Sequence, residues 1–303
     1  MSCKALIVGY GSAGRRHSEI LSEFSEIDEI GIVSSQKGLP FKSFSSLEQA
    51  VEYKPDYVII ASETYKHEDH LKYIIGNFSA EKILVEKPLF KEYSIINPKD
   101  KDIFTGYNLR FHPHIQSLRK LIEKQKIRAV YCSCHTFLPE WRTNNSYTDS
   151  YSSSRERGGG VMLDLSHEID FLIWLFGYLE IDFVKYGNFS NLLIDSEDSL
   201  FLSGHLKNNV PLELSLSYFS LLPKRELHVV TDEISISVDL VSNSLKYRKK
   251  GLNQVTDILD SFDINVTYIL QHKDILSKRS SFVCTYSEGL QVNKFIDQLK
   301  SWT

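Results

Sequence analysis

The chain has 303 residues, which is enough for two domains of ordinary size. Its formal net charge of −4, without Lys- or Arg-rich runs, argues against nucleic acid as the main partner. The first apolar run, residues 5–8, is too short for a signal peptide, and no later run approaches the ~18 residues of a membrane span. Since the four cysteines suit a reducing compartment, we expect a cytoplasmic protein with no membrane partner.

Short apolar runs alternate with helical patterns through the first hundred residues. The runs expected to form strands are residues 5–8, 29–33, 57–61, 82–85 and 103–107. Helical periodicity covers residues 15–24, 46–53 and 65–75. This alternation predicts an α/β unit with a parallel, doubly wound sheet.

A glycine-rich turn follows the first expected strand directly and opens the first helical pattern. It reads Gly9, Tyr10, Gly11, Ser12, Ala13, Gly14. In this setting a GxGxxG sequence predicts a dinucleotide site, in which Gly11 lets the backbone approach a pyrophosphate and Gly14 lets helix and strand pack closely. The alternative is a glycine turn that binds nothing.

The end of the second expected strand bears on the choice of cofactor. An NAD site usually has an acidic residue here to bind the ribose 2′-hydroxyl. This chain has Ser34, Ser35, Gln36 and Lys37 instead. The two hydroxyls and Lys37 favour the 2′-phosphate of NADP, and the alternative for Lys37 is a solvated loop lysine.

Polar residues follow three further strands: Ala61, Ser62, Glu63 and His67, then Glu86 and Lys87 before a proline, then Asn108 and Arg110. Ligands of open parallel sheets bind at the carboxyl ends of the strands, so we expect these groups to lie around one crevice. Lys87 is placed there for proton transfer. The alternative is an ordinary strand exit with a solvated lysine.

The pattern becomes strand-rich after a helical stretch at residues 113–124. The expected strands are residues 128–137, 180–189, 200–205, 212–220, 226–231, 233–240 and 245–249. Helices are expected at residues 164–176 and 288–302. These elements predict an α+β domain, residues 110–303, on an open and largely antiparallel sheet, after a dinucleotide-binding domain of residues 1–109.

A polar and aromatic loop precedes a glycine triplet in the second half. The loop contains Trp141, Arg142, Tyr147 and Tyr151. Aromatic faces suit sugar rings and arginine forks suit phosphate or carboxylate, although a solvated surface lid is the alternative. After the triplet, Asp164 and His167 are candidates for catalysis, against a helix-end aspartate and a helix histidine with satisfied hydrogen bonds.

Together these motifs resemble those of the Gfo/Idh/MocA oxidoreductases, NAD(P)-dependent enzymes that act mainly on sugars, polyols and nucleotide sugars. The resemblance rests on the glycine turn, residues 61–67, the Glu-Lys-Pro sequence, residues 106–111, and the glycine triplet with Asp164 and His167. It covers almost the whole chain. It implies an N-terminal Rossmann domain, a second domain whose sheet often forms an oligomer interface, and hence a homodimer or homotetramer.

The resemblance also implies roles for individual residues. Lys87, Asp164 and His167 would be catalytic. Cofactor would contact Gly9, Tyr10, Gly11, Ser12, Ala13, Gly14, Ser34, Ser35, Lys37, Ala61, Ser62, Glu63, His67, Glu86, Lys87, Asn108, Trp141 and Arg142. Substrate would contact Lys87, Arg110, Tyr147, Tyr151, Asp164 and His167. No metal is expected; Cys132, Cys134 and His135 are better explained by buried thiols on a strand.

Two departures from the family pattern affect these roles. Glu63 stands where the family usually has proline, so the loop at residues 61–67 is expected to sit differently against the cofactor. The family more commonly spaces the aspartate and histidine by four residues, and here Glu168 occupies that place. One residue is a rotation of about 100° on a helix, so His167 and Glu168 compete for one role, and His167 is preferred.

We expect reversible hydride transfer between a nicotinamide and a secondary alcohol of a sugar or nucleotide sugar, possible in surface-glycan synthesis. Two alternatives stay open within the family. An NAD-dependent glycosidase would recycle its cofactor without net reduction. A non-catalytic NAD(P)-sensing regulator would bind the cofactor without turnover.

Overall fold

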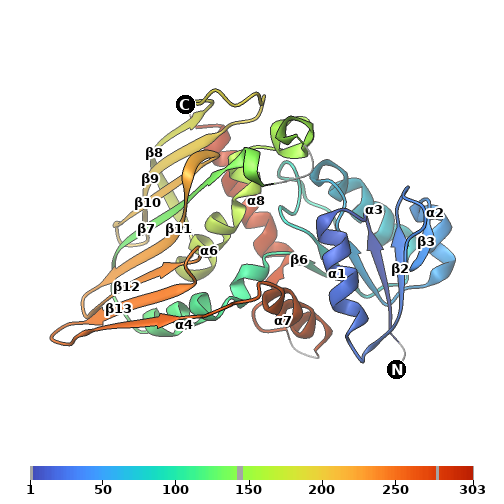
Figure 1. Cartoon of the computed structure of the whole chain (residues 1–303), viewed down its shortest axis with the longest axis horizontal. Coiled ribbons are helices and arrows are strands. Elements are labelled where there is room, and N and C mark those ends of the chain that lie inside the picture. The colour runs from blue at the N-terminus through green and yellow to red at the C-terminus, as the bar shows by residue number, and fades with distance from the viewer. Residues whose placement is uncertain (1–2, 142–145, 278–279, 303) are drawn as a thin grey trace. The chain divides into compact units, whose positions relative to one another are not determined.

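The computed structural model describes residues 3–141, 146–277 and 280–302 (Figure 1). The chain forms two compact units, Met1–Asn108 with Asn265–Asp297, and Leu109–Ile264 with Gln298–Thr303. The sequence division at residue 109 differs from this grouping in one segment, because Asn265–Asp297 returns to the first unit. None of the helices in the described ranges has the length and hydropathy needed to cross a bilayer.

The first unit is built on a sheet with the strand order β15-β6-β5-β4-β1-β2-β3. Its strands are β1 (Cys3–Val8), β2 (Ile27–Val33), β3 (Lys42–Phe44), β4 (Tyr57–Ile60), β5 (Lys82–Val85), β6 (Asp102–Thr105) and β15 (Cys284–Thr285). All neighbours pair in parallel except β15, which is antiparallel to β6. Because both faces of such a sheet are covered, its central strands are continuous apolar runs. The predicted parallel sheet is confirmed.

Helices of the first unit are α1 (Ser12–Ser22), α2 (Leu47–Ala50), α3 (His67–Asn77), α7 (Asn265–Leu276) and α8 (Tyr286–Lys300), with short 3-10 turns at Val51–Tyr53 and Thr64–Lys66. The helix expected at residues 46–53 is therefore an α-turn followed by a 3-10 turn. β3, β15 and α7 are absent from the sequence prediction. Two contacts fasten the returning segment: Lys82 Nζ donates to the carbonyl of Ile275, and Asn293 Nδ2 donates to the carbonyl of Phe90 at 2.7 Å.

The second unit has a sheet with the order β14-β13-β12-β11-β7-β10-β9-β8. Its strands are β7 (Ile127–Phe137), β8 (Leu179–Gly187), β9 (Ser199–Leu206), β10 (Val210–Ser217), β11 (Phe219–Thr231), β12 (Ile234–Asp239), β13 (Ser244–Lys249) and β14 (Gln254–Ile258). β10 is parallel to β7, and the other neighbours are antiparallel. The predicted largely antiparallel sheet is confirmed, and β14 is an edge strand that the sequence prediction lacks.

One face of this second sheet is covered by helix and the other is open. Side chains of strand β7 point alternately to the two faces. Cys132 and Cys134 are buried, whereas Tyr131, one residue before Cys132, is exposed. The helices of this unit are α4 (Pro113–Ile122), α5 (Val161–Asp164) and α6 (Ser166–Phe176), with 3-10 turns at Leu138–Glu140, Tyr147–Asp149 and Tyr151–Ser153. The single helix expected at residues 164–176 is broken at Leu165, so the aspartate and the histidine belong to different helices.

Candidate functional site

The strand-end motifs of the first unit lie in a row along one edge of its sheet. This carboxyl edge comprises the residues that follow β1, β2, β4, β5 and β6, namely Gly9, Ser34, Ala61, Glu86 and Gly106. Their backbone N–H groups continue the strand pairing, for example from Glu86 to the Ile60 carbonyl at 2.8 Å. The sheet therefore brings together the predicted cofactor residues of the first unit.

The glycine turn has the geometry that a pyrophosphate needs. Gly9 has φ +99°, and a Cβ there would lie 2.7 Å from the carbonyl oxygen of Ala61. A Cβ on Gly14 would overlap the Gly9 carbonyl, whereas none of the described atoms lies within 4 Å of a Cβ on Gly11. Among the described residues no side chain caps α1, whose first turn has no acidic residue, so its N–H groups are available to an anion.

The end of β2 includes a residue that the sequence reasoning missed. Arg15, one turn into α1, donates from Nη2 to Gln36 Oε1 at 3.2 Å, and its guanidinium lies 5.3 Å from the centre of the Tyr10 ring. Gln36 also donates to the Tyr10 carbonyl at 3.0 Å. Ser35 and Lys37 are exposed beside this arrangement. Arg15 thus joins Lys37 as a cation at the end of β2, where the sequence has hydroxyls and no carboxylate.

His67 connects the loop after β4 with the loop after β5. Its ring lies between the carbonyl oxygens of Ser62 and Pro88, each 3.0 Å from a ring nitrogen. Burial lowers the pKa of His67, which is 1% exposed, against the effect of these carbonyls. Glu63, which stands at the family's proline position, instead binds Lys66 Nζ at 2.8 Å. His67 therefore links two parts of the carboxyl edge.

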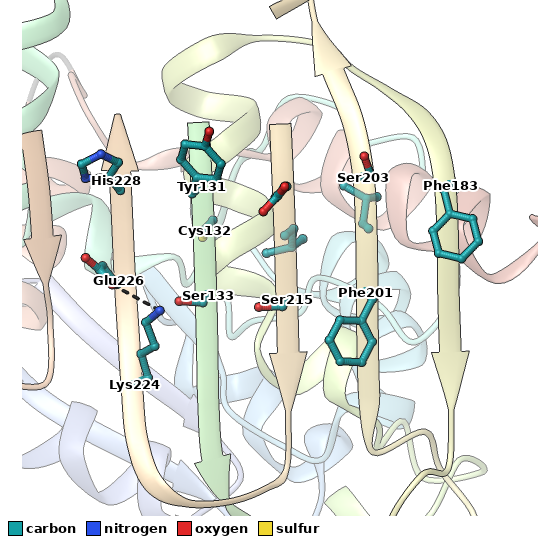
Figure 2. A pocket seen from close by; sticks show the side chains of 13 residues that line it. Tyr131, Cys132, Ser133, Phe183, Phe201, Ser203, Ser215, Lys224, Glu226 and His228 are labelled. Carbon is teal, nitrogen blue, oxygen red and sulfur yellow. Dashed lines mark ion pairs between the residues drawn. The ribbon is translucent and has the colours of Figure 1, made fainter. Parts of the chain in front are cut away.

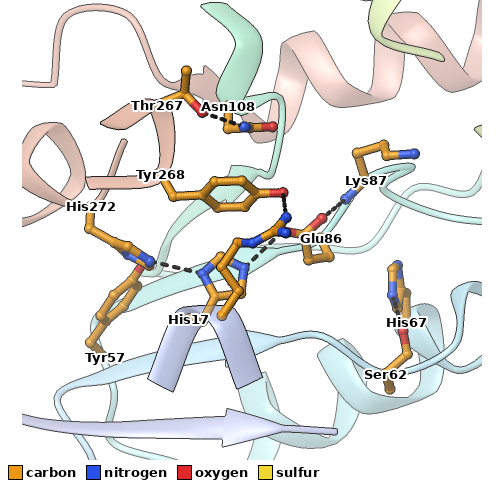
Figure 3. Close-up of polar contacts among 11 residues, drawn as sticks. His17, Tyr57, Ser62, His67, Glu86, Lys87, Asn108, Thr267, Tyr268 and His272 are labelled. Carbon is orange, nitrogen blue, oxygen red and sulfur yellow. Dashed lines mark hydrogen bonds and ion pairs between the residues drawn. The ribbon is translucent and has the colours of Figure 1, made fainter. Parts of the chain in front are cut away.

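Glu86 is a buried carboxylate directly before Lys87 (Figure 3). Its Oε1 lies 2.8 Å from Nε2 of His17 on α1, and its Oε2 accepts from the backbone N–H of Lys87 at 3.1 Å. Burial would raise the pKa of the Glu86 carboxyl, but the hydrogen bond from His17 and the charge of Lys87 hold it below its usual value. Glu86 is therefore an ionised group in the interior, and Lys87 beside it is half-buried.

Asn108 closes the row at the end of the first unit. Its Nδ2 donates to Thr267 Oγ1 on α7 at 2.6 Å (Figure 3). The returning helix thus orients an amide that the sequence predicts to bind cofactor. Thr267 has no counterpart in the sequence prediction, because nothing near it in the chain marks it as part of the site.

Asp164 in the second unit is held by a tyrosine that sequence reasoning missed. Tyr218 donates to Asp164 Oδ2 at 2.6 Å, and burial raises the pKa of Tyr218 far above its usual value, so the phenol stays protonated.

The glycine triplet packs on a second missed residue, Glu197. Gly160 has φ +121°, and a Cβ there would overlap the Glu197 carboxylate, whose pKa is raised by burial.

The contacts of Glu168 bear on whether Glu168 or His167 could take the proposed catalytic role. Glu168 forms a two-pronged ion pair with Arg225 on β11, with N···O distances of 2.6 and 3.2 Å. Burial opposes the charge of Arg225, but the Glu168 carboxylate outweighs it and raises the pKa of the guanidinium. His167 packs on Phe171, with ring centres 6.4 Å apart. The Glu168 carboxylate is engaged in the interior of the second unit, while His167 lies on α6, separated by the break at Leu165 from Asp164 on α5.

Other predicted residues of the second unit take part in internal contacts. Arg110 is 1% exposed and pairs with Asp170, with Nε 2.9 Å from Oδ2 and Nη2 2.6 Å from Oδ1. The Tyr147 hydroxyl accepts from the backbone N–H of Leu193 at 3.1 Å. Trp141 donates from Nε1 to Thr136 Oγ1, and Tyr151 begins a short 3-10 turn. Arg142 lies outside the described residues.

The cysteines of the second unit do not face their neighbouring histidine. Cys132 and Cys134 are buried thiols, and His135 on the same strand bonds Ser215 Oγ at 2.9 Å. Across residues 3–141, 146–277 and 280–302, no group of three or more His, Cys, Asp or Glu side chains is placed to hold a metal ion. The cysteines at residues 3, 132, 134 and 284 form no disulfide bond.

Comparison with known proteins gives matches over most of the chain. A family model described as "Oxidoreductase family, NAD-binding Rossmann fold" matches residues 3–97, and one described as "Oxidoreductase family, C-terminal alpha/beta domain" matches residues 119–234. An uncharacterized oxidoreductase of Synechocystis sp. is 24% identical over 196 residues, 58% of this chain and 52% of that protein. The match thus spans about half the length of this curated relative.

Solved structures share the fold at low sequence identity. A UDP-N-acetylglucosamine 3-dehydrogenase from Acidithiobacillus ferrooxidans is 18% identical with a TM-score of 0.78, over 99% of this chain and 97% of that one. A levoglucosan dehydrogenase in complex with NADH is 15% identical with a TM-score of 0.82, over 99% and 96%. A super-repressor mutant of Gal80p from Saccharomyces cerevisiae is 15% identical with a TM-score of 0.82, over 99% and 95%.

Proposed function

Because the chain belongs to the Gfo/Idh/MocA family of oxidoreductases, we propose that it transfers hydride between a nicotinamide cofactor and a secondary alcohol or ketone of a sugar or nucleotide sugar. The observation that carries the proposal is Lys87 at the carboxyl edge, two strands from the glycine turn and backed by the ionised Glu86. The sugar dehydrogenases among the structural neighbours support this substrate class, and a place in surface-glycan synthesis is part of the proposal.

The proposed chemistry pairs a hydride with a proton. When bound, the nicotinamide supplies the acceptor for the hydride and its electron pair. The substrate carbon can release that hydride only if its hydroxyl proton leaves as the C=O bond forms, so a base must lie within hydrogen-bond reach. We assign this role to the Lys87 amine, and the reverse reaction returns the proton from Lys87 to the ketone oxygen. Glu86 accepts from the backbone N–H of the same residue.

Residues of the second unit would bind and orient the substrate. Asp164, held by Tyr218, offers an acceptor for a sugar hydroxyl, and His167 is the second candidate for proton transfer. Glu168 is not assigned a catalytic role, because its carboxylate is engaged by Arg225. Substrate contacts are also proposed for Tyr147, Tyr151 and Arg110.

For the cofactor we propose NADP over NAD. Residues 34–41 contain no carboxylate to repel a 2′-phosphate. Arg15, fixed by Gln36, adds a cation to the hydroxyls of Ser34 and Ser35 and to Lys37. A planar guanidinium suits a phosphate through paired hydrogen bonds. Four cysteines that form no disulfide support a cytoplasmic location, where both cofactors are found.

The testing experiment follows absorbance of the reduced nicotinamide with NAD and NADP against nucleotide sugars, free sugars and inositols. We expect turnover with at least one sugar, faster with NADP. Lys87→Ala should lower kcat by about 100-fold or more, the range of a lost general base. Lys91→Ala is the matched control. Lys91 lies four residues after Lys87 and pairs with its neighbour Glu92, so this substitution should leave kcat unchanged. Absence of turnover across the panel, or full activity of Lys87→Ala, would contradict the proposal.

A second candidate is a cofactor-sensing regulator, which the similarity in fold to Gal80p favours. A regulator would bind NADP or NAD, seen as quenching of tryptophan fluorescence, without reducing it under any substrate. The presence of Lys87 beside the ionised Glu86 at the carboxyl edge favours the enzyme.

We also propose a homodimer or homotetramer, with the open face of the second sheet as the interface. Aromatic and polar side chains of β8, β9, β10, β7 and β11 line a hollow of about 390 Å³ on this face. Figure 2 shows Phe183 and Phe201 on one side of it and Lys224 and Glu226 on the other. The two phenylalanines are 55% and 49% exposed, and Lys224 pairs with Glu226 at 3.4 Å. Exposed aromatic side chains among polar ones are typical of protein interfaces.

A further inference from the structure

Behind Glu86, three buried polar side chains form a continuous hydrogen-bonded chain (Figure 3). His17 Nε2 lies 2.8 Å from Glu86 Oε1, and His17 Nδ1 lies 2.9 Å from Nε2 of His272 on α7. His272 Nδ1 lies 3.0 Å from the hydroxyl of Tyr57 on β4. His17, His272 and Tyr57 are all 0% exposed. We call these three residues the relay chain.

The Tyr57 hydroxyl sets the direction of the hydrogen bonds in the relay chain. In the part of the chain that the structure describes, the Tyr57 hydroxyl has His272 Nδ1 as its hydrogen-bond partner. A buried hydroxyl without an acceptor is costly, so Tyr57 donates to His272. Burial lowers the pKa of His272 well below its usual value, so the ring is neutral and its one proton sits on Nε2.

The proton on His272 Nε2 then fixes the state of His17. His272 donates to His17 Nδ1, which must therefore be an unprotonated acceptor. His17 is neutral, carries its proton on Nε2 and donates it to Glu86. The chain runs one way, from Tyr57 through His272 and His17 to the carboxylate, and every donor in it has an acceptor.

Several charged and aromatic groups surround the relay chain. Arg16 lies 5.1 Å from the centre of the Tyr268 ring, and Tyr268 packs edge-on against His17 at 5.5 Å. The remaining titratable groups that act on Glu86 or on Tyr57 are Lys87, His67 and Cys3. Since Tyr57 is buried and its phenol pKa is raised by burial, the chain does not pass protons to solvent.

We propose that His17, His272 and Tyr57 are positioning residues that keep His17 neutral and so leave Glu86 with a full, fixed negative charge behind Lys87. A protonated His17 would cancel that charge. An uncancelled carboxylate attracts both the protonated lysine and a cationic nicotinamide. The functional part of this inference rests on the proposed hydride transfer, whereas the protonation states do not depend on it.

The first test reads protonation directly by NMR of histidine labelled with ¹⁵N in the full chain, with His17 and His272 assigned from their Gln variants. We expect both rings to be neutral with the proton on Nε2 between pH 6 and 8. Tyr57→Phe removes the donor that fixes the order, so His17 should become protonatable in this range. Tyr286→Phe is the matched control, because it removes a phenol that bonds the backbone of Ile96 in the same unit and leaves the relay chain intact.

The second test uses kinetics and a conservative rescue. His272→Gln keeps a donor toward His17, whereas His272→Leu removes it. We expect His272→Leu to lower kcat about 10-fold and to change its pH profile, with substrate KM within about twofold, and His272→Gln to restore most of kcat. Equal loss in both variants would indicate a structural role and overturn the proposal.

The two tests separate the inference from the proposed function. A charged His17 in the unaltered protein, protons on Nδ1, or a Tyr57→Phe spectrum equal to that of the unaltered protein would overturn the relay chain, even if the oxidoreductase is active. The expected tautomers in a protein that turns over no sugar would support the relay chain and contradict the hydride transfer.

Discussion

At the scale of single residues, His167 and Glu168 show how neighbouring side chains are separated by their partners. Glu168 is 1% exposed and bound by Arg225, so its removal leaves a partly buried guanidinium without its carboxylate. The ring of His167 packs on Phe171. The glutamate therefore belongs to the stability of the second unit and the histidine to its proposed chemistry.

The expected result of Glu168→Gln is a loss of stability. Breaking a buried ion pair costs about 3 kcal/mol, less here because Arg225 is partly exposed. His167→Gln should lower kcat about 100-fold with a much smaller change in the free energy of unfolding. Urea unfolding and the nicotinamide assay measure the two effects. If Glu168→Gln keeps its stability and loses activity, the assignment is reversed.

At the scale of elements, the second sheet is asymmetric. The inner face of strand β9 contributes Leu200 and Leu202 to the core, while Phe201 between them points to the open face. Because side chains alternate across a strand, β9 places apolar residues on both faces of the sheet. α5 and α6 cover the inner face in the same unit, and a second copy is proposed to cover the outer one.

Phe201→Lys should therefore shift the protein toward monomer. A charge placed in the interface would have to be buried without a counter-ion, which is costly. Sedimentation velocity of the full chain measures the mass. Leu193→Lys is the control, since Leu193 is 75% exposed on a loop of the same unit and outside the hollow. A monomeric unaltered protein, or an unchanged oligomer in Phe201→Lys, would rule out this interface.

At the scale of the whole molecule, buried neutral histidines make stability depend on pH. Burial lowers the pKa of His67 and His272 in the first unit, and lowers that of His112 in the second unit to about 4. His112 faces Asn243, His114 and Arg225. An unfolded histidine has a pKa of about 6.5, so below that pH the unfolded chain binds more protons than the folded one.

Stability should accordingly be constant above pH ~6.5 and fall as the pH drops toward 4, by up to about 1.4 kcal/mol per pH unit for each such histidine. Urea midpoints at pH 7.5, 6.0 and 5.0 measure this. His112→Gln should flatten the dependence, whereas His228→Gln, on the open face of the second sheet, should not. A midpoint that stays constant or rises on acidification would contradict the prediction.

Much of the fold was readable because its signals are local. Apolar runs ended by glycine or polar residues predicted β1, β2, β4, β5 and β6, and the GxGxxG sequence predicted the turn into α1. The short strands β3 and β15 gave too few residues for a pattern to show. Helix α7 was missed because three of its four buried residues, Thr267, Gln271 and His272, are polar, so it lacks an apolar stripe. The break at Leu165 has no local signal, because residues 161–176 contain neither glycine nor proline.

The sequence by itself determined which chemical groups stand at the strand ends, Glu86 and Lys87 above all, since strand exits depend on residues next to one another. Only the tertiary structure decided what each group bonds: His17 and His272 behind Glu86, Tyr218 on Asp164, Arg225 on Glu168. These partners are 54 to 255 residues apart in the chain. Packing brings such pairs together, and burial then fixes their charges, so neither could be read from local pattern.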